Sequence, residues 1–324
     1  MQTIQWGIIG CGDVTEVKSG PAFNKASNST LVAVMRRDGA KAQDYAHRHG
    51  VAKWYDNAAA LINDSGVNAV YIATPPSSHK QYALAAIEAG KPVYLEKPMA
   101  NDYASARAIA DAATANNVPL VVAHYRREQP RFKKVKQLLT EKAIGEVLYA
   151  RFELCKHPLT PQELTQHKVA WRVDPAIAGG GIFHDLSPHQ LDLLYYFLGP
   201  VEKVCGAATS QGSLYKADDM VTASILFKNG AAFSGVWCFN APEEKDTCEI
   251  TGTKGKISFN VFSTNAITVN IEGNSHTYTF DDLPHVQQPM VQAAVNYFLG
   301  KSDNPCPAED GAEIMRLIDV ITHH

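Results

Sequence analysis

The chain has 324 residues, of which 45% are hydrophobic and 19% are charged, and its 30 basic and 33 acidic side chains give a formal net charge of −3. This length favours two domains, each with its own core, and the composition is typical of a globular protein. A charge so close to zero provides no field that attracts nucleic acid, and no apolar run is long enough to cross a membrane. We therefore expect neither partner.

The six cysteines are scattered along the chain, without a Cys-x-x-Cys pair. In a chain of this size such spacing is typical of reduced thiols. The first residues lead directly into an apolar strand and show no signal peptide. The sequence therefore predicts a cytoplasmic protein.

Short apolar runs alternate with helical patterns from residue 4 to about residue 123. Alternation of this kind is typical of a parallel sheet with right-handed crossovers and helices on both faces. We expect residues 1–123 to form such a doubly wound α/β domain. The predicted strands are 4–9, 31–35, 67–73, 93–95 and 120–123, with a short one around Trp54, and the predicted helices include 40–49, 79–89 and 103–116.

The pattern changes in residues 124–324, where strands separated by turns dominate. Turns at residues 228–230 and 272–274 indicate hairpins, so this second domain should be α+β with a largely antiparallel sheet. A long loop is expected before the glycines 179–181, followed by a helix that starts near Asp185. The predicted strands are 146–154, 201–209, 221–227, 231–239, 247–252, 256–260, 266–271 and 276–280, and the other helices are 132–139, 288–299 and 309–321.

A glycine turn follows the first strand and precedes a helix. Glycine has no Cβ, so backbone N–H groups and a helix N-terminus can approach a pyrophosphate closely. Thr15 stands where the usual fingerprint has a third glycine, and such a string alone also fits a structural turn. Its position favours a dinucleotide site, whose predicted residues are Gly10, Cys11, Gly12, Asp13 and Val14.

Arg36 and Arg37 stand at the end of the second strand. An acidic side chain there binds the adenosine ribose, whereas an arginine accommodates a 2′-phosphate. Two guanidinium groups therefore favour NADP over NAD. The alternative is a pair of solvated arginines before a surface helix, and the neighbouring Asp38 weakens the NADP interpretation.

The loop after the strand at 67–73 lies at the carboxyl edge of the predicted sheet, where ligands of doubly wound folds bind. Thr74, Pro75 and His79 are therefore predicted to line the ribose and phosphates of the cofactor. Ser77 and Ser78 are also suited to cap the next helix.

Glu96 and Lys97 follow another strand at the same edge. A lysine sheltered from water beside a nicotinamide can have its pKa lowered enough to exchange protons near neutral pH. The bond to Pro98 can be cis. The alternative is a surface ion pair of little energetic value, but the location favours a catalytic and cofactor-binding role.

Asp185 and His189 are four residues apart in the helix after the glycines, so they share one face, and Asp192 lies near it. An imidazole beside a carboxylate can act as a general acid or base near neutrality. A buried structural histidine is the alternative. A metal site built from His184, Asp185 and His189 would leave Lys97 and the glycine turn unexplained, so we expect no metal.

Together these segments resemble the glucose-fructose oxidoreductase, inositol dehydrogenase and rhizopine-catabolism (Gfo/Idh/MocA) family of NAD(P)-dependent oxidoreductases over nearly the whole chain. The resemblance implies a Rossmann domain followed by an open-faced sheet that often forms a subunit interface, with the substrate between the domains. His189 stands where dihydrodiol-dehydrogenase-like relatives place a tyrosine, which argues against a dihydrodiol substrate. The matching segments are 7–13, 96–98, 143–147, 171–172, 179–192 and 251–255.

The resemblance also implies an activity: hydride transfer between nicotinamide and a carbinol or carbonyl carbon of a sugar, polyol or related hydroxy compound. Lys97 and His189 would carry the acid–base chemistry and Asp185 would orient them. NADP is the preferred cofactor and NAD the second choice, and a homodimer or homotetramer is expected. The expected substrate contacts are Tyr125, Arg126, His157, Trp171, Arg172, Asp185 and His189.

Two other functions remain open at this point. One is an NAD-dependent glycosidase that oxidises its substrate transiently and recycles the cofactor. The other is a regulator that senses the cofactor without catalysis, although the combined presence of Lys97, His189 and Asp185 counts against it.

Overall fold

The chain divides into two units in a computed structural model that describes residues 2–322. The first unit comprises Met1–Gln129 and Leu283–Met315, and the second comprises Pro130–Asp282 and Arg316–His324. The first unit therefore extends past the boundary expected at residues 123 and 124, to Gln129, and a late segment also returns to it. The return has a packing cause: Phe298 lies 5.7 Å from Trp6 between ring centroids, and Gln292 accepts a hydrogen bond from the Ser27 N–H.

The first unit contains a six-stranded parallel sheet with the strand order β3-β2-β1-β4-β5-β6. This confirms the doubly wound fold and the short strand around Trp54. The order reverses between β1 and β4, and ligands of such sheets bind at the carboxyl ends near this point. The strands are β1 (Ile4–Ile9), β2 (Ser29–Met35), β3 (Lys53–Tyr55), β4 (Ala69–Ile72), β5 (Val93–Leu95) and β6 (Leu120–Val122).

Buried aromatic rings form the core of this unit beside the sheet. Ring centroids are 4.8 Å apart for Trp6 and Phe23, and 5.1 Å apart for Phe23 and Tyr71 and for Tyr71 and Tyr94. The helices are α1 (Asp13–Val17), α2 (Gly20–Lys25), α3 (Gly39–His49), α4 (Ala58–Ile62), α5 (His79–Glu88), α6 (Tyr103–Ala115), α12 (Gln288–Phe298) and the first part of α13 (Ala308–Thr322), with 3₁₀ turns η1 (Pro76–Ser78) and η2 (Tyr125–Glu128).

The second unit contains an eight-stranded sheet with the order β14-β13-β12-β11-β7-β10-β9-β8. Every neighbouring pair is antiparallel except β7 and β10, and both expected hairpins are present. The strands are β7 (Val147–Cys155), β8 (Val201–Thr209), β9 (Met220–Phe227), β10 (Ala232–Cys238), β11 (Lys245–Gly252), β12 (Gly255–Phe259), β13 (Ala266–Ile271) and β14 (Asn274–Thr279).

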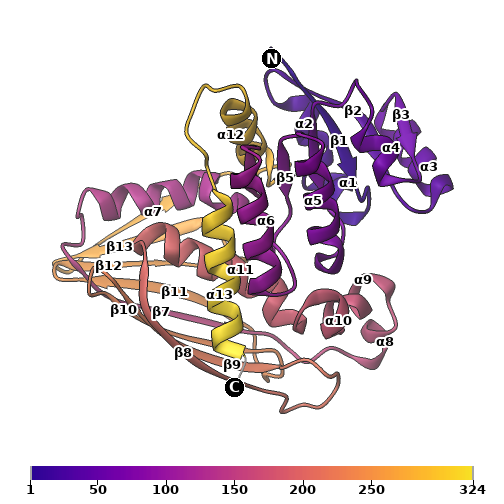
Figure 1. Cartoon of the computed structure of the whole chain (residues 1–324). Helices are drawn as coiled ribbons and strands as arrows, with labels where there is room; N and C mark the ends of the chain where they lie inside the picture. Colours follow the sequence, from indigo (N-terminus) through magenta and orange to yellow (C-terminus); the bar gives the residue numbers. More distant parts are fainter. Residues whose placement is uncertain (1, 323–324) are drawn as a thin grey trace. The chain divides into compact units, whose positions relative to one another are not determined.

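One face of this sheet is covered and the other is open. Helices α7 (Pro130–Thr140) and α11 (Gly181–Leu198) lie along the covered face (Figure 1). Phe259 is central there, with its ring centroid 6.0 Å from Phe132, 5.9 Å from Phe152 and 6.1 Å from Phe197. In the central strands β7, β9 and β10, side chains of the opposite parity are mostly exposed or half-buried, as expected for a sheet with one solvated face.

The long loop expected before the glycines is instead partly helical. It contains α8 (Pro161–Leu164), α9 (His167–Ala170), η3 (Trp171–Val173) and α10 (Pro175–Ala178), and α11 begins at Gly181 rather than near Asp185. Local capping accounts for two of these turns. Thr160 and Glu163 form a reciprocal capping box at α8, and the Asp174 side chain accepts a hydrogen bond from the Ala176 N–H at α10.

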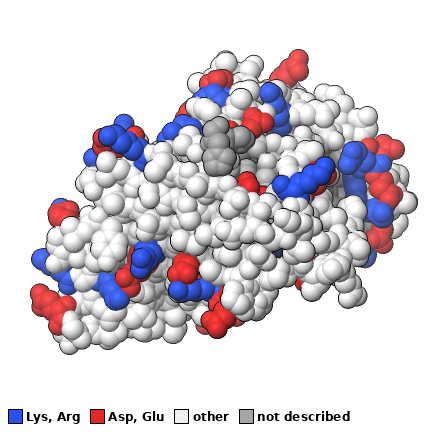
Figure 2. Space-filling view, turned by 90° about the horizontal axis from the view of Figure 1, so that it is seen from below, with Lys and Arg blue, Asp and Glu red and all other residues white. Residues whose placement is uncertain are grey.

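No helix within residues 2–322 is both long and apolar enough to cross a membrane. On the face of the molecule seen in Figure 2, basic and acidic side chains are interspersed in small groups. This mixture agrees with the formal net charge of −3.

Candidate active site

The glycine turn begins where β1 ends. Gly10 has φ +97°, and a Cβ at this position would lie 2.7 Å from the Thr74 side chain and 2.8 Å from its backbone nitrogen. The N–H groups of Gly10 and Cys11 donate to the Met35 carbonyl, at 2.8 and 3.2 Å. The turn therefore requires glycine at this position and joins the ends of β1, β2 and β4 at the carboxyl edge.

Cys11 and Thr15 are buried parts of this turn. Burial raises the pKa of the Cys11 thiol to about 11, so the thiol is uncharged at neutral pH. The Thr15 hydroxyl donates to the Gly12 carbonyl at 2.8 Å, and the Thr15 carbonyl accepts from the Tyr45 hydroxyl at 2.8 Å. At Gly20, in contrast, a Cβ would collide with the Thr15 carbonyl and the Tyr45 hydroxyl. The third glycine of the usual fingerprint permits close packing of the backbone after the turn. In this chain Gly20 permits it instead, which the sequence reasoning missed.

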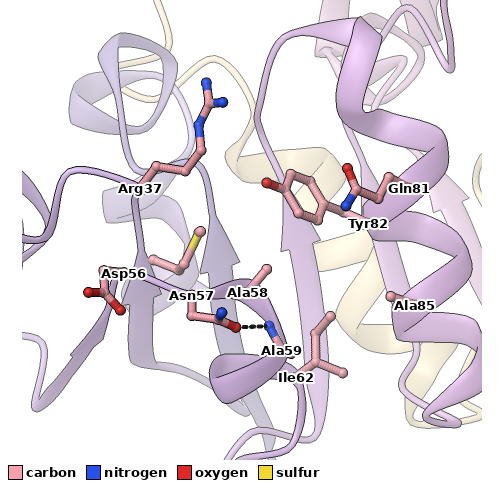
Figure 3. Close-up of a pocket in the computed structure, with 10 residues that line it drawn as sticks. Arg37, Asp56, Asn57, Ala58, Ala59, Ile62, Gln81, Tyr82 and Ala85 are labelled. Atoms are coloured by element: carbon pink, nitrogen blue, oxygen red, sulfur yellow. Dashed lines mark hydrogen bonds between the residues drawn. The ribbon is translucent and has the colours of Figure 1, made fainter.

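The structure separates the two arginines at the end of β2. Arg36 is half-buried, and its Nη1 donates to the Cys11 carbonyl at 3.3 Å, so it supports the glycine turn. Arg37 is exposed and lines a cavity of about 340 Å³. Figure 3 shows Arg37 on one side of this cavity and Gln81 and Tyr82 of α5 on the other.

Asp38 serves the next helix rather than this cavity. Its side chain accepts a hydrogen bond from the Lys41 N–H at 3.2 Å and pairs with the Lys41 ammonium at 3.0 Å. These contacts hold the pKa of Asp38 below its usual value. An acid that caps α3 in this way explains why a carboxylate occurs beside the two arginines.

His79 lies fully inside the first unit, between the loop after β4 and the segment after β5. Its Nε2 is 2.7 Å from the Thr74 carbonyl oxygen and its Nδ1 is 3.0 Å from the Pro98 carbonyl oxygen. Burial lowers the pKa of His79 to about 4, so the ring is neutral at pH 7. In the structure it joins Thr74 to Pro98, and its predicted cofactor contact stays a prediction.

The serines of the same loop do not cap α5 with their side chains. Ser78 occupies the N-cap position, but its side chain makes no capping hydrogen bond. Its hydroxyl donates instead to the Thr74 hydroxyl, at 2.8 Å, and to the Pro75 carbonyl, at 3.0 Å. Thr74 and Pro75 are thereby fixed at the carboxyl edge, where the sequence predicts cofactor contacts.

Glu96 is the centre of a buried hydrogen-bond network directly before Lys97. Its Oε1 accepts from the Tyr71 hydroxyl at 2.5 Å and from Gln287 Nε2 at 2.6 Å, and its Oε2 accepts from the Lys97 N–H at 3.1 Å. The Tyr94 hydroxyl donates to Gln287 Oε1 at 3.1 Å. Burial and the Glu96 charge raise the pKa of Tyr71 well above its usual value, so this hydroxyl remains a donor.

This network fixes the backbone at Lys97, which is half-buried at the carboxyl edge of β5. The Lys97–Pro98 peptide is cis.

Tyr71 and Gln287 were missed by the sequence reasoning. Tyr71 sits within an apolar strand that reads as core, and Gln287 lies 191 positions from Glu96 in an irregular segment.

In the second unit, Asp185 and His189 lie on α11 as the spacing predicts. Arg172 Nε donates to Asp185 Oδ2 at 3.2 Å, and the Arg172 guanidinium lies 4.6 Å from the Trp171 ring centroid. His189 is buried, with its ring centroid 5.8 Å from that of Phe262. Residues 171–189 thus carry an aromatic ring and a guanidinium in η3, and a carboxylate and an imidazole on α11.

Two of the three glycines allow close packing at the start of this helix. At Gly180 a Cβ would collide with the His184 ring, and at Gly181, which has φ +79°, it would collide with the Ala217 side chain. Gly180, directly before α11, and Gly181, its first residue, must therefore both lack a side chain.

The remaining predicted residues are divided between the units. Tyr125 and Arg126 are in η2 of the first unit, with the Arg126 guanidinium 5.6 Å from the Tyr125 ring centroid. His157 follows β7 in the second unit, is exposed, and has its Nδ1 3.2 Å from the Ala241 carbonyl oxygen. Lys97 belongs to the first unit, and its pairing with Asp185 and His189 stays a prediction.

Comparisons with known proteins follow the same division. Residues 4–124 match the family described as "Oxidoreductase family, NAD-binding Rossmann fold", and residues 132–258 match the GFO/IDH/MocA C-terminal domain. "Oxidoreductase P35" from Formosa agariphila is 50% identical over 317 residues, which is 98% of each chain.

More distant proteins also align with most of the chain. The 1,5-anhydro-D-fructose reductase from Ensifer adhaerens is 28% identical over 255 residues, covering 78% of this chain and 74% of that protein. A solved structure of levoglucosan dehydrogenase with NADH and levoglucosan has a TM-score of 0.87 at 24% identity, over 99% of this chain and 96% of the other. At that identity the likeness establishes the fold.

Proposed function

The chain belongs to the GFO/IDH/MocA family of oxidoreductases and is an NAD(P)-dependent dehydrogenase or reductase acting on CH–OH groups, and we propose which of its residues carry the reaction. The observation that carries the proposal is the buried Glu96 network, which fixes Lys97 at the same sheet edge as the glycine turn. The proposed substrate is a sugar, a polyol or a related hydroxy compound.

The first unit offers a suitable site for a dinucleotide. A Cβ at Gly12 would meet only the Gly10 carbonyl oxygen, at 3.9 Å, so the backbone there is open at the edge of the sheet, and the cavity beside Arg37 has room for the adenosine part. The cofactor supplies C4 of its nicotinamide as the hydride donor or acceptor. Gly10, Cys11, Gly12, Asp13 and Val14 would contact its phosphates, and Thr74, Pro75, Glu96 and Lys97 would fix its other half.

Acid–base chemistry is assigned to both units. His189 takes the proton from the substrate hydroxyl during oxidation and returns it during reduction. Lys97 polarises the same oxygen, which makes the carbon a better hydride donor or acceptor. Asp185 orients the imidazole and is itself held by Arg172. Tyr125, Arg126, His157 and Trp171 are the proposed substrate contacts.

A preference for NADP over NAD is supported by the placement of Arg37. Its exposed guanidinium lies at the cavity wall, where a 2′-phosphate would accept charge-assisted hydrogen bonds. Such an interaction contributes about 1.5–3 kcal/mol, or about ten- to a hundredfold in affinity. Titration with NADPH and NADH, followed by nicotinamide fluorescence, measures the preference in the wild type and in Arg37→Asp. Equal binding of the two cofactors by the wild type would refute it.

The reaction itself is tested with a panel of sugars, inositols and sugar acids, each combined with NAD and NADP. We expect a substrate-dependent change in nicotinamide absorbance with at least one compound. Product formation without any net absorbance change would indicate instead a glycosidase that recycles its cofactor. Cofactor binding without turnover of any compound would favour a regulator.

The protein is also proposed to act in the cytoplasm as a homodimer or homotetramer. Its six cysteines are all free, as is typical of proteins from a reducing compartment. The open face of the second sheet, with the exposed Tyr149 on β7, is the proposed contact surface.

A further inference from the structure

Two cysteines lie on neighbouring strands of the second unit, apart from the residues assigned above. Cys155 is the last residue of β7 and Cys238 is the last residue of β10, and the two are direct partners in the parallel register. Both thiols are free and half-buried. They alternate with the buried Leu154 and Trp237, so both thiols belong to the open face of the sheet.

The spacing of the strands decides what this pair can bind. Neighbouring strands lie about 4.8 Å apart, and paired side chains on one face project in the same direction. The Cα atoms of an unstrained disulfide are about 4.4–6.8 Å apart, so two cysteines paired at this spacing are within reach of one another. A single atom bonded to both sulfurs can therefore bridge them.

The chemistry of the thiols further limits which ligands this pair can bind. Burial, followed by the charge of Glu153, raises the pKa of the Cys155 thiol, which therefore stays protonated at neutral pH. Such a thiol is a poor nucleophile towards reagents that need a thiolate. Within residues 2–322 no group of three or more His, Cys, Asp and Glu side chains is placed to hold a metal ion. A ligand that needs only two thiols, and that can react with a protonated one, fits best.

We propose that Cys155 and Cys238 form a dithiol site for a trivalent arsenical. An arsenoxide, R–As=O, condenses with the two thiols to give R–As(S-Cys)₂ and one water. Two S–H bonds and the As=O bond break, two As–S bonds form, and both protons leave on the oxygen. Arsenic stays trivalent, so no oxidant is needed. Soft sulfur ligands favour such a soft centre.

The loop between β8 and β9 leads into Met220, which pairs with Cys238 in the antiparallel register. Tyr215 in that loop has its pKa raised to about 12, mainly by burial, with the nearby Asp219 and Cys238 contributing. Its hydroxyl is buried and has no hydrogen-bond partner among residues 2–322. Asp219 holds the loop, since its carboxylate accepts from the N–H groups of Gln211 and Gly212, both at 2.7 Å. A group added to Cys238 is therefore expected to disturb this loop.

The same loop contacts the helix that carries Asp185 and His189. Ala217 packs against Gly181, the first residue of α11, where no Cβ fits. From the other side, Trp237, next to Cys238, donates from Nε1 to Gln190 Oε1 on α11 at 2.6 Å. Bridging the two cysteines therefore disturbs α11 as well. This consequence for catalysis rests on the proposed function, whereas arsenical binding does not.

Binding is tested on the full-length protein with phenylarsine oxide and intact-mass measurement. We expect one equivalent to survive excess 2-mercaptoethanol and to be removed by 2,3-dimercaptopropanol, the behaviour of a dithiol. Cys155→Ser and Cys238→Ser should each lose this retention. Cys205→Ser is the matched control, because Cys205 is exposed on β8 and is paired with Ser224 rather than with a cysteine.

Release of the arsenical from the wild type by the monothiol would overturn the proposal, as would its retention by either variant. Circular dichroism checks that each variant is folded, and Cys155→Ala and Cys238→Ala replace any serine variant that is not. Hydrogen exchange then tests the loop: the amides of Gln211 and Gly212 should exchange at least several-fold faster in the arsenical complex. Unchanged exchange and turnover in a complex of confirmed stoichiometry would overturn the coupling to α11.

Discussion

Lys97 is held at the sheet edge by its backbone N–H bond to a carboxylate that is itself fixed by Tyr71 and Gln287. Lys97→Met is expected to lower kcat by roughly two to four orders of magnitude, since a positioned acid–base group contributes about this much. Cofactor affinity, measured by nicotinamide fluorescence, should change little. Lys80→Met, which alters an exposed lysine on α5, is the control. Near wild-type turnover in Lys97→Met would remove this lysine from the mechanism.

Asp64 shows a second effect of a single residue, on stability rather than on catalysis. Hydrogen bonds from Lys53, the Gly66 N–H and Tyr55 lower its pKa from 3.8 to about 2. A depressed pKa in the folded state means that the stabilisation is complete above about pH 4 and is lost as the pH falls through 2. At pH 7 it amounts to about 1–2 kcal/mol.

Urea unfolding of Asp64→Asn measures this contribution. The variant should be less stable than the wild type at pH 7, and the difference should disappear near pH 2. Asp111→Asn removes an exposed carboxylate that pairs with Arg107 on the same helix, and it should change stability by less than about 0.5 kcal/mol. A difference at Asp64 that is equally large at both pH values would contradict the assigned cause.

At the scale of elements, the segment before α12 connects several parts of the first unit. His285 has its Nδ1 2.7 Å from the Val17 carbonyl oxygen, and the Gln287 N–H donates to the Lys18 carbonyl at 3.3 Å. The Gln287 side chain bridges Tyr94 and Glu96. This segment has no regular structure of its own, so its conformation depends on these bonds.

Gln287→Leu should therefore destabilise the protein by about 1–3 kcal/mol, because it leaves a buried carboxylate and a buried hydroxyl each short of one partner. Gln292→Leu on α12 is the matched control, since its amide bonds mostly at the surface, and it should cost less than about 1 kcal/mol. The denaturant midpoints of the two variants, compared with that of the wild type, measure these losses of stability. Equal losses of stability would show that the buried network contributes no more than the surface hydrogen bonds of Gln292.

The elements show where sequence reasoning succeeds. The strand at Ile4–Ile9 and the helix at Gly39–His49 have clear apolar periods, and the structure contains them almost as predicted. The sequence predicts the start of α11 four residues too late. The helix begins at Gly181, which packs against Ala217, and it follows Gly180, which packs against the His184 ring; neither contact is visible in the sequence. A short helix such as α8 spans too few residues for a period to be visible, and only its capping box of Thr160 and Glu163 indicates it.

The candidate site shows the same distinction. Residue type and position select Gly10, Lys97 and the pair on α11 as candidates, whose roles stay predictions. They could not separate Arg36 from Arg37, because only the folded chain shows that Arg36 bonds the Cys11 carbonyl while Arg37 lines the cavity. The link from Glu96 to Gln287 has no signal in sequence, since it joins residues 191 positions apart.

At the scale of the whole molecule, the proposed assembly depends on the open face of the second sheet. Tyr149 on β7 is 45% exposed, which is unusual for a large ring in a central strand. Tyr149→Lys places a charge on this face and should weaken association at least tenfold, measured by light scattering over a dilution series. Trp54→Lys, at an exposed ring of the first unit, should leave the assembly unchanged. A monomeric wild type would exclude the assembly.

The discontinuity of the first unit also sets an order of events on the ribosome. Glu96 emerges long before Gln287, with the whole segment 130–282 synthesised between them. At about 5–20 residues per second, this interval lasts on the order of ten seconds or more. Throughout it the nascent sheet lacks α12 against Trp6 and lacks the amide partner of a buried carboxylate. A message that ends early therefore yields an unfinished nucleotide-binding unit, even when every one of its strands has been made.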